Sequence, residues 1–368
     1  MSKKSEFQRK DGSTYAPVGR VKHVCKKGEF RFSAAGLDHG HIFGMCNGLL
    51  EAGAELVSVY DPDPQKVKGF LDKFPEAQPA ESLDEVINEP SINLVACAAV
   101  PRDRGEIGVK AMLAGKDFFA DKPPFVSMEQ LEECREVSQN TGRKFFVYFS
   151  ERLHVEAAVC AGKLIQEGAV GRVIHMDGFG PHRHSPELRP AWFYDKSAYG
   201  GIICDIGSHQ IEQFLYYTGA KSAKVDFSRT ANYNNPEHPE FEDYGEVVLT
   251  GNNGATCHIR LDWFTPDALP VWGDGRTFIV GTDGYIELRK YINVGEDSGG
   301  SHIFLCNKSE CRHIQADNTT GFPFFGRLIR DCLDRTESSM SQEHVFNTME
   351  LTLRAQNAAR FDKFFEEK

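Results

Sequence analysis

The chain has 368 residues, of which 40% are hydrophobic and 26% charged, and its formal net charge is −11. This length suits two domains, and the negative charge argues against a nucleic-acid backbone or an anionic membrane as the main partner. The chain has no apolar run long enough to span a membrane, and its start has no apolar signal core.

Residues 1–29 read as a polar, basic N-terminal arm that is interrupted by glycine and proline. Two interpretations of this arm stay open. It is either a disordered tail or an ordered arm that lies across a neighbouring subunit, and Tyr15 and Pro17 slightly favour the second.

A strand, a turn and a helix open the first predicted domain. Residues 30–35 (FRFSAA) predict a strand, 36–44 (GLDHGHIFG) a turn into a helix, and 56–60 a second strand that ends at Asp61. This order, with an acidic residue after the second strand, is that of a dinucleotide-binding unit. Backbone amides at the helix start would hold the pyrophosphate, and Asp61 the adenosine ribose. A second carboxylate, Asp63, would help repel a 2′-phosphate, which predicts NAD rather than NADP.

The glycine pattern of this turn is unusual. Asp38 and His41 stand where the second and third glycines of the motif are expected, so Gly36, Gly40 and Gly44 would act with altered spacing. Asp38 either caps the helix or weakens phosphate contact by its like charge. An ordinary βαβ turn is the alternative to a cofactor site. The cofactor-binding residues expected here are Gly36, Asp38, His39, Gly40, His41 and Asp61.

Strands and helices alternate regularly as far as residue 150. The further predicted elements are strands at 94–100, 117–120 and 145–149 and a helix at 106–114. Such alternation predicts an α/β fold, with a Rossmann-type, doubly wound parallel sheet in an NAD-binding domain at 30–150. Ligands of such sheets bind beyond the carboxyl ends of the strands. We therefore expect Pro101, Arg102 and Lys122, which follow strand ends, to lie at the cofactor.

Longer strands dominate after residue 150. A helix is predicted at 154–167, and the segments 252–254 (NNG) and 282–284 (TDG) read as hairpin turns. The predicted strands are 173–179, 222–231, 245–249, 255–264, 277–280 and 285–288. This pattern predicts an α+β domain at 151–368 with a large, mostly antiparallel open sheet, helices on one face and a last helix at 343–365.

The stretch 200–212 (GGIICDIGSHQIE) carries a candidate proton-transfer site. Asp205, His209 and Glu212 follow one another at helical spacing, which would place them on one face of a helix. An imidazole that titrates near neutrality and is oriented by acids is suited to moving a proton. The alternative is a buried helix in which the aspartate and the histidine only hydrogen-bond each other.

The ten cysteines are scattered, with no Cys-x-x-Cys pair. Cys306 and Cys311 are the two closest in sequence. In a chain of this size, the pattern predicts reduced thiols in a cytoplasmic protein rather than a disulfide framework.

Taken together, these motifs resemble the Gfo/Idh/MocA family of NAD(P)-dependent enzymes over roughly residues 31–365. The resemblance rests on Asp61, on Asp121-Lys122-Pro123, on Arg152 within FSERLH and on GGIICDIGSH, in that order. The sequence departs from the family pattern at Asp38, at Asp121, where glutamate is usual, and at Tyr199, where a further glycine is common.

The resemblance implies hydride transfer between a nicotinamide and a secondary hydroxyl of a sugar, polyol or glycoside, with the C3 hydroxyl of a glucosyl group favoured. Lys122 and His209 would be the proton-handling pair, with Asp205 beside them. Oxidising an alcohol requires removal of the hydroxyl proton as hydride leaves carbon. His209 is suited to take that proton, Asp205 to orient the ring and Lys122 to stabilise the alkoxide. The expected substrate-binding residues are Arg152, His182, Trp192, Asp205 and His209.

Two other classes of function compete with this one. The pairs His39-x-His41 and His182-x-His184 suggest a metal hydrolase, but paired histidines without matching carboxylates or cysteines more often form hydrogen bonds, so no metal is expected. A non-catalytic NAD- or sugar-binding protein on the same fold is the other alternative. We expect a small carbohydrate or glycoside as substrate, no nucleic-acid or membrane partner, and a homo-oligomer through the C-terminal sheet and the N-terminal arm.

Overall fold

A computed structural model of the chain describes residues 12, 15–19, 22–296 and 298–365 and contains two compact units. One unit combines residues 13–148 with Phe322–Phe346, and the other contains Phe149–Gly321 and the segment from Asn347. The first unit thus includes a return of the chain, Phe322–Phe346, that lies within the predicted second domain. No helix among the described residues is long and apolar enough to cross a membrane.

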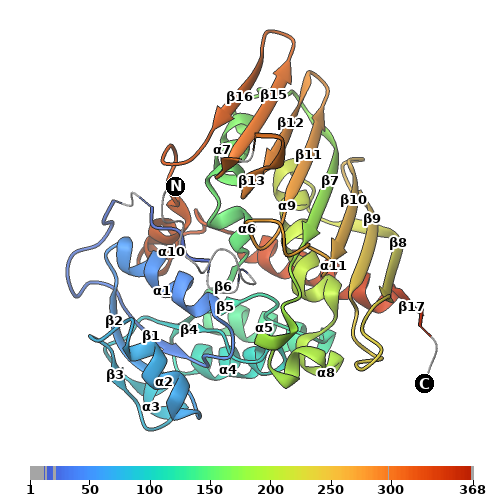
Figure 1. Ribbon diagram of the computed structural model, residues 1–368. Helices are drawn as coiled ribbons and strands as arrows, with labels where there is room; N and C mark the ends of the chain where they lie inside the picture. Colours follow the sequence, from blue (N-terminus) through green and yellow to red (C-terminus); the bar gives the residue numbers. More distant parts are fainter. Residues whose placement is uncertain (1–11, 13–14, 20–21, 297, 366–368) are drawn as a thin grey trace. The chain divides into compact units, whose positions relative to one another are not determined.

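The first unit contains a six-stranded parallel sheet in the order β3-β2-β1-β4-β5-β6 (Figure 1). This is the strand order of dinucleotide-binding folds and confirms the predicted doubly wound sheet. Its strands are β1 (Arg31–Ala35), β2 (Glu55–Tyr60), β3 (Gln78–Pro79), β4 (Leu94–Cys97), β5 (Asp117–Asp121) and β6 (Phe145–Tyr148). Its helices are α1 (His41–Glu51), α2 (Pro64–Leu71), α3 (Leu83–Asn88), α4 (Pro101–Leu113), α5 (Met128–Thr141) and α10 (Pro323–Asp334).

The helix after β4 begins earlier than the sequence suggests. It was expected at residue 106, but α4 starts at Pro101, and β4 ends at Cys97 instead of continuing to residue 100. Proline favours the first turn of a helix, because its fixed φ suits that turn and its missing N–H is not needed there.

The α10 helix completes the core of this unit. The ring of Phe324 lies 5.8 Å from that of Phe119, and Phe325 lies 6.2 Å from Tyr148. Gly48 of α1 leaves room for this packing, because a Cβ at that position would lie 2.3 Å from the Phe325 ring.

Two residues of the N-terminal arm, Gly19 and Val24, form hydrogen bonds with the first unit. The Gly19 amide donates a hydrogen bond to Glu51 Oε2 (3.2 Å), and the Val24 amide donates to the Ala52 carbonyl (3.0 Å). For these residues the interpretation as a disordered tail is wrong. The remainder of the predicted arm lies outside the described residues.

The second unit is built on a nine-stranded sheet in the order β16-β15-β12-β11-β7-β10-β9-β8-β17 (Figure 1). Neighbouring strands are antiparallel except for the parallel pairs β7–β10 and β8–β17, so the predicted mostly antiparallel sheet is confirmed. The strands are β7 (Val173–Pro181), β8 (Ala223–Asn232), β9 (Tyr244–Gly251), β10 (Thr256–Asp262), β11 (Arg276–Gly281), β12 (Gly284–Arg289), β15 (His302–Asn307), β16 (Cys311–Gln315) and β17 (Arg360–Lys363).

The C-terminal segment corrects one prediction. The last helix was expected to extend to residue 365, but α11 covers Gln342–Ala358 and the chain then forms β17 beside β8. The local sequence has helical spacing, but the edge of β8 offers backbone hydrogen bonds that only a strand can use.

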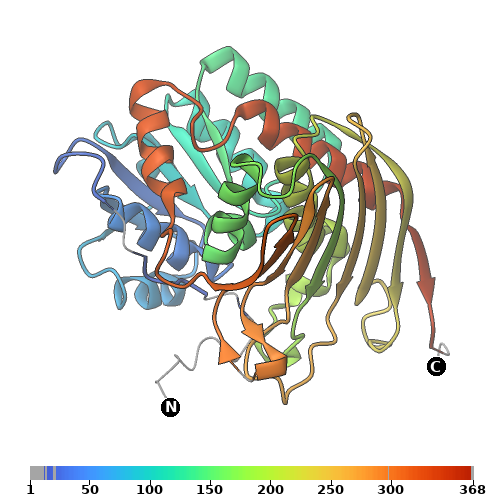
Figure 2. The ribbon, with the colours of Figure 1, turned by 90° about the horizontal axis from the view of Figure 1, so that it is seen from above.

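The helices α6 (Ser150–Leu153), α7 (Glu156–Gln166), α9 (Ser208–Thr218) and α11 lie on one face of the nine-stranded sheet (Figure 2). Gly178 and Gly180 of β7 point toward α9, because a Cβ on Gly178 would lie 3.0 Å from Gln210 Oε1. Side chains alternate along a strand, so Phe179 points to the opposite face. The smaller elements are η2 (Pro186–Leu188), η3 (Ala191–Tyr194), α8 (Lys196–Tyr199), η4 (Ile203–Gly207), η5 (Val294–Glu296), β13 (Ile292–Asn293) and β14 (Ser298–Gly299).

Cys306 and Cys311 stand directly opposite each other in the β15–β16 hairpin and form a disulfide. The prediction of reduced thiols is therefore wrong for this pair. The hairpin itself was missed in the sequence, so its cross-strand register was not foreseen. The other eight cysteines are free.

Candidate functional site

The turn between β1 and α1 is fixed to the strand ends beside it. The Gly36 amide donates a hydrogen bond to the Tyr60 carbonyl (2.9 Å). Gly36 has a φ of 73°, and a Cβ there would lie 2.5 Å from the Cβ of Ala99, so this position requires glycine. The N-cap of α1 is Gly40, which has no side chain to cover this end of the helix. A helix N-terminus of this kind attracts phosphate groups.

Asp38 does not cap α1, and the capping interpretation is wrong. Its Oδ1 accepts a hydrogen bond from Lys66 Nζ (2.5 Å), and its Oδ2 accepts one from the Val100 amide (3.2 Å). Lys66 also lies 3.8 Å from Asp61 Oδ1, while Asp61 Oδ2 accepts the Leu37 amide (2.6 Å). Burial lowers the pKa of Lys66, but its hydrogen bond to Asp38 and the nearby carboxylates outweigh burial and raise it. Lys66 thus offsets part of the negative charge by which Asp38 was expected to weaken contact with the cofactor phosphates.

Asp121, at the end of β5, is the centre of a buried polar cluster. Its Oδ1 accepts the Lys122 amide (2.7 Å) and lies 2.7 Å from His41 Nδ1. Its Oδ2 lies 3.1 Å from His39 Nδ1 and 3.1 Å from Arg104 Nη2. Burial favours the neutral acid, but the charges of His41, Arg104 and His39 outweigh it and hold the pKa of Asp121 well below its usual range. The carboxylate is therefore ionised at neutral pH.

The Arg104 guanidinium also fixes the backbone around Lys122. Its Nε donates to the Ala99 carbonyl (2.7 Å), and its Nη1 donates to the carbonyls of Lys122 (2.6 Å) and Pro123 (3.0 Å). The Lys122–Pro123 peptide bond is cis. One buried arginine, which the sequence analysis missed, thus binds both the carboxylate before Lys122 and the carbonyls that follow it.

Replacing Arg104 with methionine is expected to lower the free energy of unfolding by about 3–5 kcal/mol, because it removes the arginine partner of the buried Asp121 carboxylate and the hydrogen-bond donor of three carbonyls. Urea denaturation measures the loss. Lys110→Met on the same helix is the control: Lys110 pairs with Glu106 at 50% and 71% side-chain exposure, and such a pair contributes about 1 kcal/mol or less. Equal losses in the two variants would contradict the assignment.

The side chains of His39, His41 and Asp121 bring their ligand atoms within 4.8 Å of one another. Arg104 already supplies a positive charge to this carboxylate. Hydrogen bonding within this cluster joins His41 to Asp121. Burial, followed by the neighbouring His41, lowers the pKa of His39 to about 4, so the His39 ring is neutral near pH 7.

The two expected cofactor residues after β4 differ in exposure. Pro101 is buried in the first turn of α4. Arg102 is exposed, and its Nε lies 3.8 Å from Asp103 Oδ1. Both follow β4. The segment after β4 is joined to the β1–α1 turn by a hydrogen bond from the Ala98 amide to the Gly36 carbonyl (3.1 Å).

In the second unit, the segment that carries His209 is not one regular helix. Asp205 lies in the π-helical turn η4, and α9 begins at Ser208, so His209 stands in its first turn. The regular α-helix that was assumed for this stretch is wrong for residues 203–207, which form a π turn. The common face of Asp205, His209 and Glu212 stays a prediction. His209 is buried, with its ring centroid 6.5 Å from that of Phe149.

Glu212 forms an ion pair with Arg152. The Arg152 Nε donates to both carboxylate oxygens of Glu212 at 2.7 Å, and the guanidinium lies 3.9 Å from the centroid of the Tyr216 ring. The structure therefore places Arg152, a predicted substrate ligand, in a buried ion pair with its own chain.

His182 stands in an aromatic surrounding that the sequence analysis did not assign. Its ring centroid lies 4.6 Å from that of Trp272 and 5.4 Å from that of Trp263, and both indoles are buried. Trp272 in turn lies 4.4 Å from Tyr291. The predicted apolar contact, Trp192, is half-buried in η3 and packs beside Phe193. Nothing in the local sequence indicated that Trp263 and Trp272 would reach His182.

The two residues after His182 have structural partners. The Arg183 Nη2 donates to the carbonyls of Pro266, Leu269 and Val271, so Arg183 organises residues 266–271. His184 stacks on Phe241 at 5.2 Å, and burial, followed by the nearby Arg189, lowers its pKa to about 4. Arg183 is buried.

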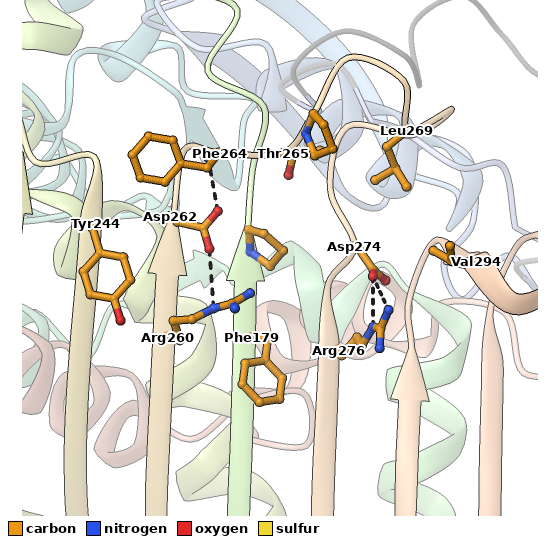
Figure 3. A pocket seen from close by; sticks show the side chains of 12 residues that line it. Phe179, Tyr244, Arg260, Asp262, Phe264, Thr265, Leu269, Asp274, Arg276 and Val294 are labelled. Atoms are coloured by element: carbon orange, nitrogen blue, oxygen red, sulfur yellow. Dashed lines mark hydrogen bonds and ion pairs between the residues drawn. The ribbon is translucent and has the colours of Figure 1, made fainter. Parts of the chain in front are cut away.

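A cavity of about 760 Å³ lies at the ends of β7, β9, β10 and β11 (Figure 3). Arg260 lies 3.4 Å from Asp262 in this cavity, and Arg276 pairs with Asp274. Phe179 also lines it and points away from α9. The cavity therefore opens on the face of the sheet opposite His209 and is separate from the predicted catalytic side chains.

Two family models match the chain. Residues 39–149 match the oxidoreductase family with an NAD-binding Rossmann fold, and residues 160–287 match the GFO/IDH/MocA C-terminal domain. The chain belongs to the GFO/IDH/MocA oxidoreductase family. The first match covers β2 to β6 of the six-stranded sheet of this GFO/IDH/MocA protein, and the second covers β7 to β11 and most of β12 of its nine-stranded sheet.

Other GFO/IDH/MocA-like proteins show how far the similarity extends. The chain is 28% identical over 240 residues to scyllo-inositol 2-dehydrogenase (NAD(+)) of Bacillus subtilis (strain 168), covering 64% of this chain and 66% of that protein. It is 29% identical over 149 residues to D-xylose dehydrogenase of Paenarthrobacter nicotinovorans, covering 39% of this chain and 38% of that protein. The matches thus span less than two thirds of these curated relatives. The chain is also similar to a protein from Erwinia carotovora atroseptica SCRI1043 whose crystal structure is described as that of an oxidoreductase. The two sequences are 49% identical, and the structures match with a TM-score of 0.88 over 90% of this chain and 99% of that chain.

Proposed function

We propose that the protein is an NAD-dependent dehydrogenase that transfers hydride between nicotinamide and a secondary hydroxyl of a sugar, polyol or glycoside. The observation that carries the proposal is the placement of Lys122: it follows β5 in the NAD-binding fold, and Asp121 and Arg104 fix its backbone on both sides. Relatives named for dehydrogenation of scyllo-inositol and D-xylose support a polyol or sugar as substrate.

The residues around the β1–α1 turn fit a dinucleotide. Gly36 keeps the turn open, the amides at the start of α1 would hold the pyrophosphate, and Asp61 would accept hydrogen bonds from the ribose. NAD, when bound, supplies the hydride acceptor for the alcohol carbon.

The chain's own residues would handle the proton. We assign His209 to take the hydroxyl proton, Asp205 to orient the imidazole and Lys122 to stabilise the negative charge that develops on the substrate oxygen. His182 with Trp263 and Trp272 would contact the substrate, because buried indole faces beside a polar ring suit the mixed apolar and hydroxyl surface of a sugar. Within the broad substrate class, we propose the C3 hydroxyl of a glucosyl group.

A panel of free sugars, inositols and aryl glycosides tests the proposal. NADH absorbance identifies the substrates, and NMR of the products identifies the oxidised carbon. A ketone at C3 of a glucosyl group is the expected product. Bound NAD without reduction by any member of the panel would instead favour the non-catalytic alternative.

The cofactor preference follows from the charges near Asp61. We expect NAD to bind at least tenfold more tightly than NADP, a difference of about 1.4 kcal/mol. Asp38 and Asp61 already share Lys66 between them, so this lysine has no charge to spare for a 2′-phosphate. Calorimetric titration with both dinucleotides measures the ratio, and equal or tighter NADP binding would contradict it.

The variant Asp38→Asn tests the role of Lys66 in that preference. Releasing Lys66 from one of its two carboxylates should shift the affinity ratio toward NADP. Asp63→Asn is the comparison variant: it removes the second carboxylate expected to repel a 2′-phosphate, and asparagine still caps α2 through the Gln65 amide, which Asp63 accepts at 2.9 Å. A larger shift in Asp63→Asn would show that Asp63 is the main source of repulsion.

We also propose that the protein is a homo-oligomer through the nine-stranded sheet. The face opposite α9 carries exposed aromatic side chains, among them Phe227 (46% exposed) and Tyr285 (40%). Large apolar side chains gathered on one face are typical of subunit contacts. Light scattering of the purified protein determines the number of subunits.

A further inference from the structure

A buried carboxylate near His209 has no role in the mechanism above. Glu151 of α6 is 2% exposed, and its Oε2 accepts hydrogen bonds from Lys290 Nζ (2.5 Å) and from Gln210 Nε2 (2.8 Å). Gln210 directly follows His209 in the first turn of α9. This hydrogen bond therefore ties Glu151 to the turn of helix that carries the proposed base.

The charge of Glu151 also acts on the two nearby imidazoles. Burial would raise the pKa of Glu151, but Lys290, His209 and His182 together outweigh burial and lower the pKa far below its ordinary range. Such an interaction is mutual. A carboxylate that is stabilised by a protonated imidazole stabilises that protonated imidazole to the same extent.

The charged groups that act on Glu151 of α6 come from several elements of this unit. His209 belongs to α9, His182 follows the end of β7, and Lys290 lies in the segment after β12. Asp205 belongs to the preceding π turn. Glu212, on the same helix, is neutralised by Arg152 in a bidentate pair.

We infer that Glu151 is a positioning residue for His209, fixed by Lys290 and Gln210, and that its carboxylate favours the imidazolium that forms when His209 takes the substrate proton. Asp205 is then not the sole acid that acts on the ring. The inference depends on the proposed function for the role of His209, but not for the interaction between the two side chains.

The interaction can be measured without any substrate. In protein with ¹³C-labelled histidine rings, NMR titration gives the pKa of His209, whose signal is assigned by its loss in His209→Gln. Glu151→Gln is expected to lower that pKa by about one pH unit, because a nearby carboxylate favours the charged ring. Lys290→Met is expected to raise it, because a positive charge is removed.

The opposite directions of these two shifts distinguish the inferred role from a structural one. Damage to packing would move the pKa in the same direction in both variants or in neither. Glu156→Gln is the control: Glu156 is a buried carboxylate of α7 that accepts the amides of Thr320 and Gly321, and its loss should leave His209 unchanged.

Two results would overturn the role of Glu151, and a third would separate it from the proposed function. An unchanged or raised pKa of His209 in folded Glu151→Gln overturns the inference. If that variant does not fold, Lys290→Met decides, since an unchanged or lowered pKa there overturns it as well. If the expected pKa shifts occur but the protein oxidises no carbohydrate, the interaction is upheld and the proposed function is rejected. If the enzyme is active, the pH–rate profile of Glu151→Gln should move to lower pH together with the His209 pKa measured by NMR.

Discussion

His209→Ala is expected to lower the turnover number for alcohol oxidation by a factor on the order of 10² to 10⁴, the usual contribution of a general base. In the unmodified enzyme, the rate of ketone formation should rise with pH through one ionisation, because only the neutral imidazole accepts the hydroxyl proton. The alanine variant should lose this dependence. Initial rates of NADH formation from about pH 5 to 9 measure both effects.

The comparison with Asp205→Asn assigns the roles of the two side chains. This variant should keep a weaker pH dependence, displaced to lower pH, because the charge that favours the imidazolium is gone. If instead His209→Ala retained the pH dependence and Asp205→Asn abolished it, Asp205 would be the base. If neither variant changed it, Lys122 would become the leading candidate.

Lys122→Ala is expected to lower the turnover number at least 100-fold, since a fixed positive charge that stabilises a developing alkoxide commonly contributes that much. The buried backbone contacts with Asp121 and Arg104 do not involve the replaced side chain, so the fold should be kept. Stopped-flow rates with saturating NAD and substrate measure the effect. Lys110→Ala, an exposed lysine of α4, is the control and should leave the rate unchanged. Near-normal turnover in Lys122→Ala would assign the lysine to the scaffold.

The parts of the fold that rest on local pattern were predictable. Apolar strands that alternate with capped helices specified the first sheet, and the position of Asp61 after the second strand agreed with its place beside the β1–α1 turn. The turns at 252–254 and 282–284 specified two hairpins of the second sheet. In these segments each local preference agrees with the final structure.

The contacts between distant segments were not predictable in this way. Glu151 and Lys290 are 139 residues apart, and Arg152 and Glu212 are 60 residues apart. No sequence period links such pairs, so Arg152 was interpreted as a substrate ligand and Glu151 was overlooked. The π turn at 203–207 was missed for a related reason, because composition does not distinguish it from an ordinary helical turn.

The return of Phe322–Phe346 to the first unit has a consequence for how the protein is made. The ribosome synthesises the six strands of the Rossmann sheet first. Phe324 and Phe325 of α10, which pack on Phe119 and Tyr148, follow about 175 residues after the end of β6. A nascent chain that ends near residue 150 therefore still exposes the surface that α10 covers. The cofactor-binding unit therefore cannot finish folding before most of the other unit has been synthesised. Truncated translation products would expose aromatic side chains that chaperones and proteases recognise.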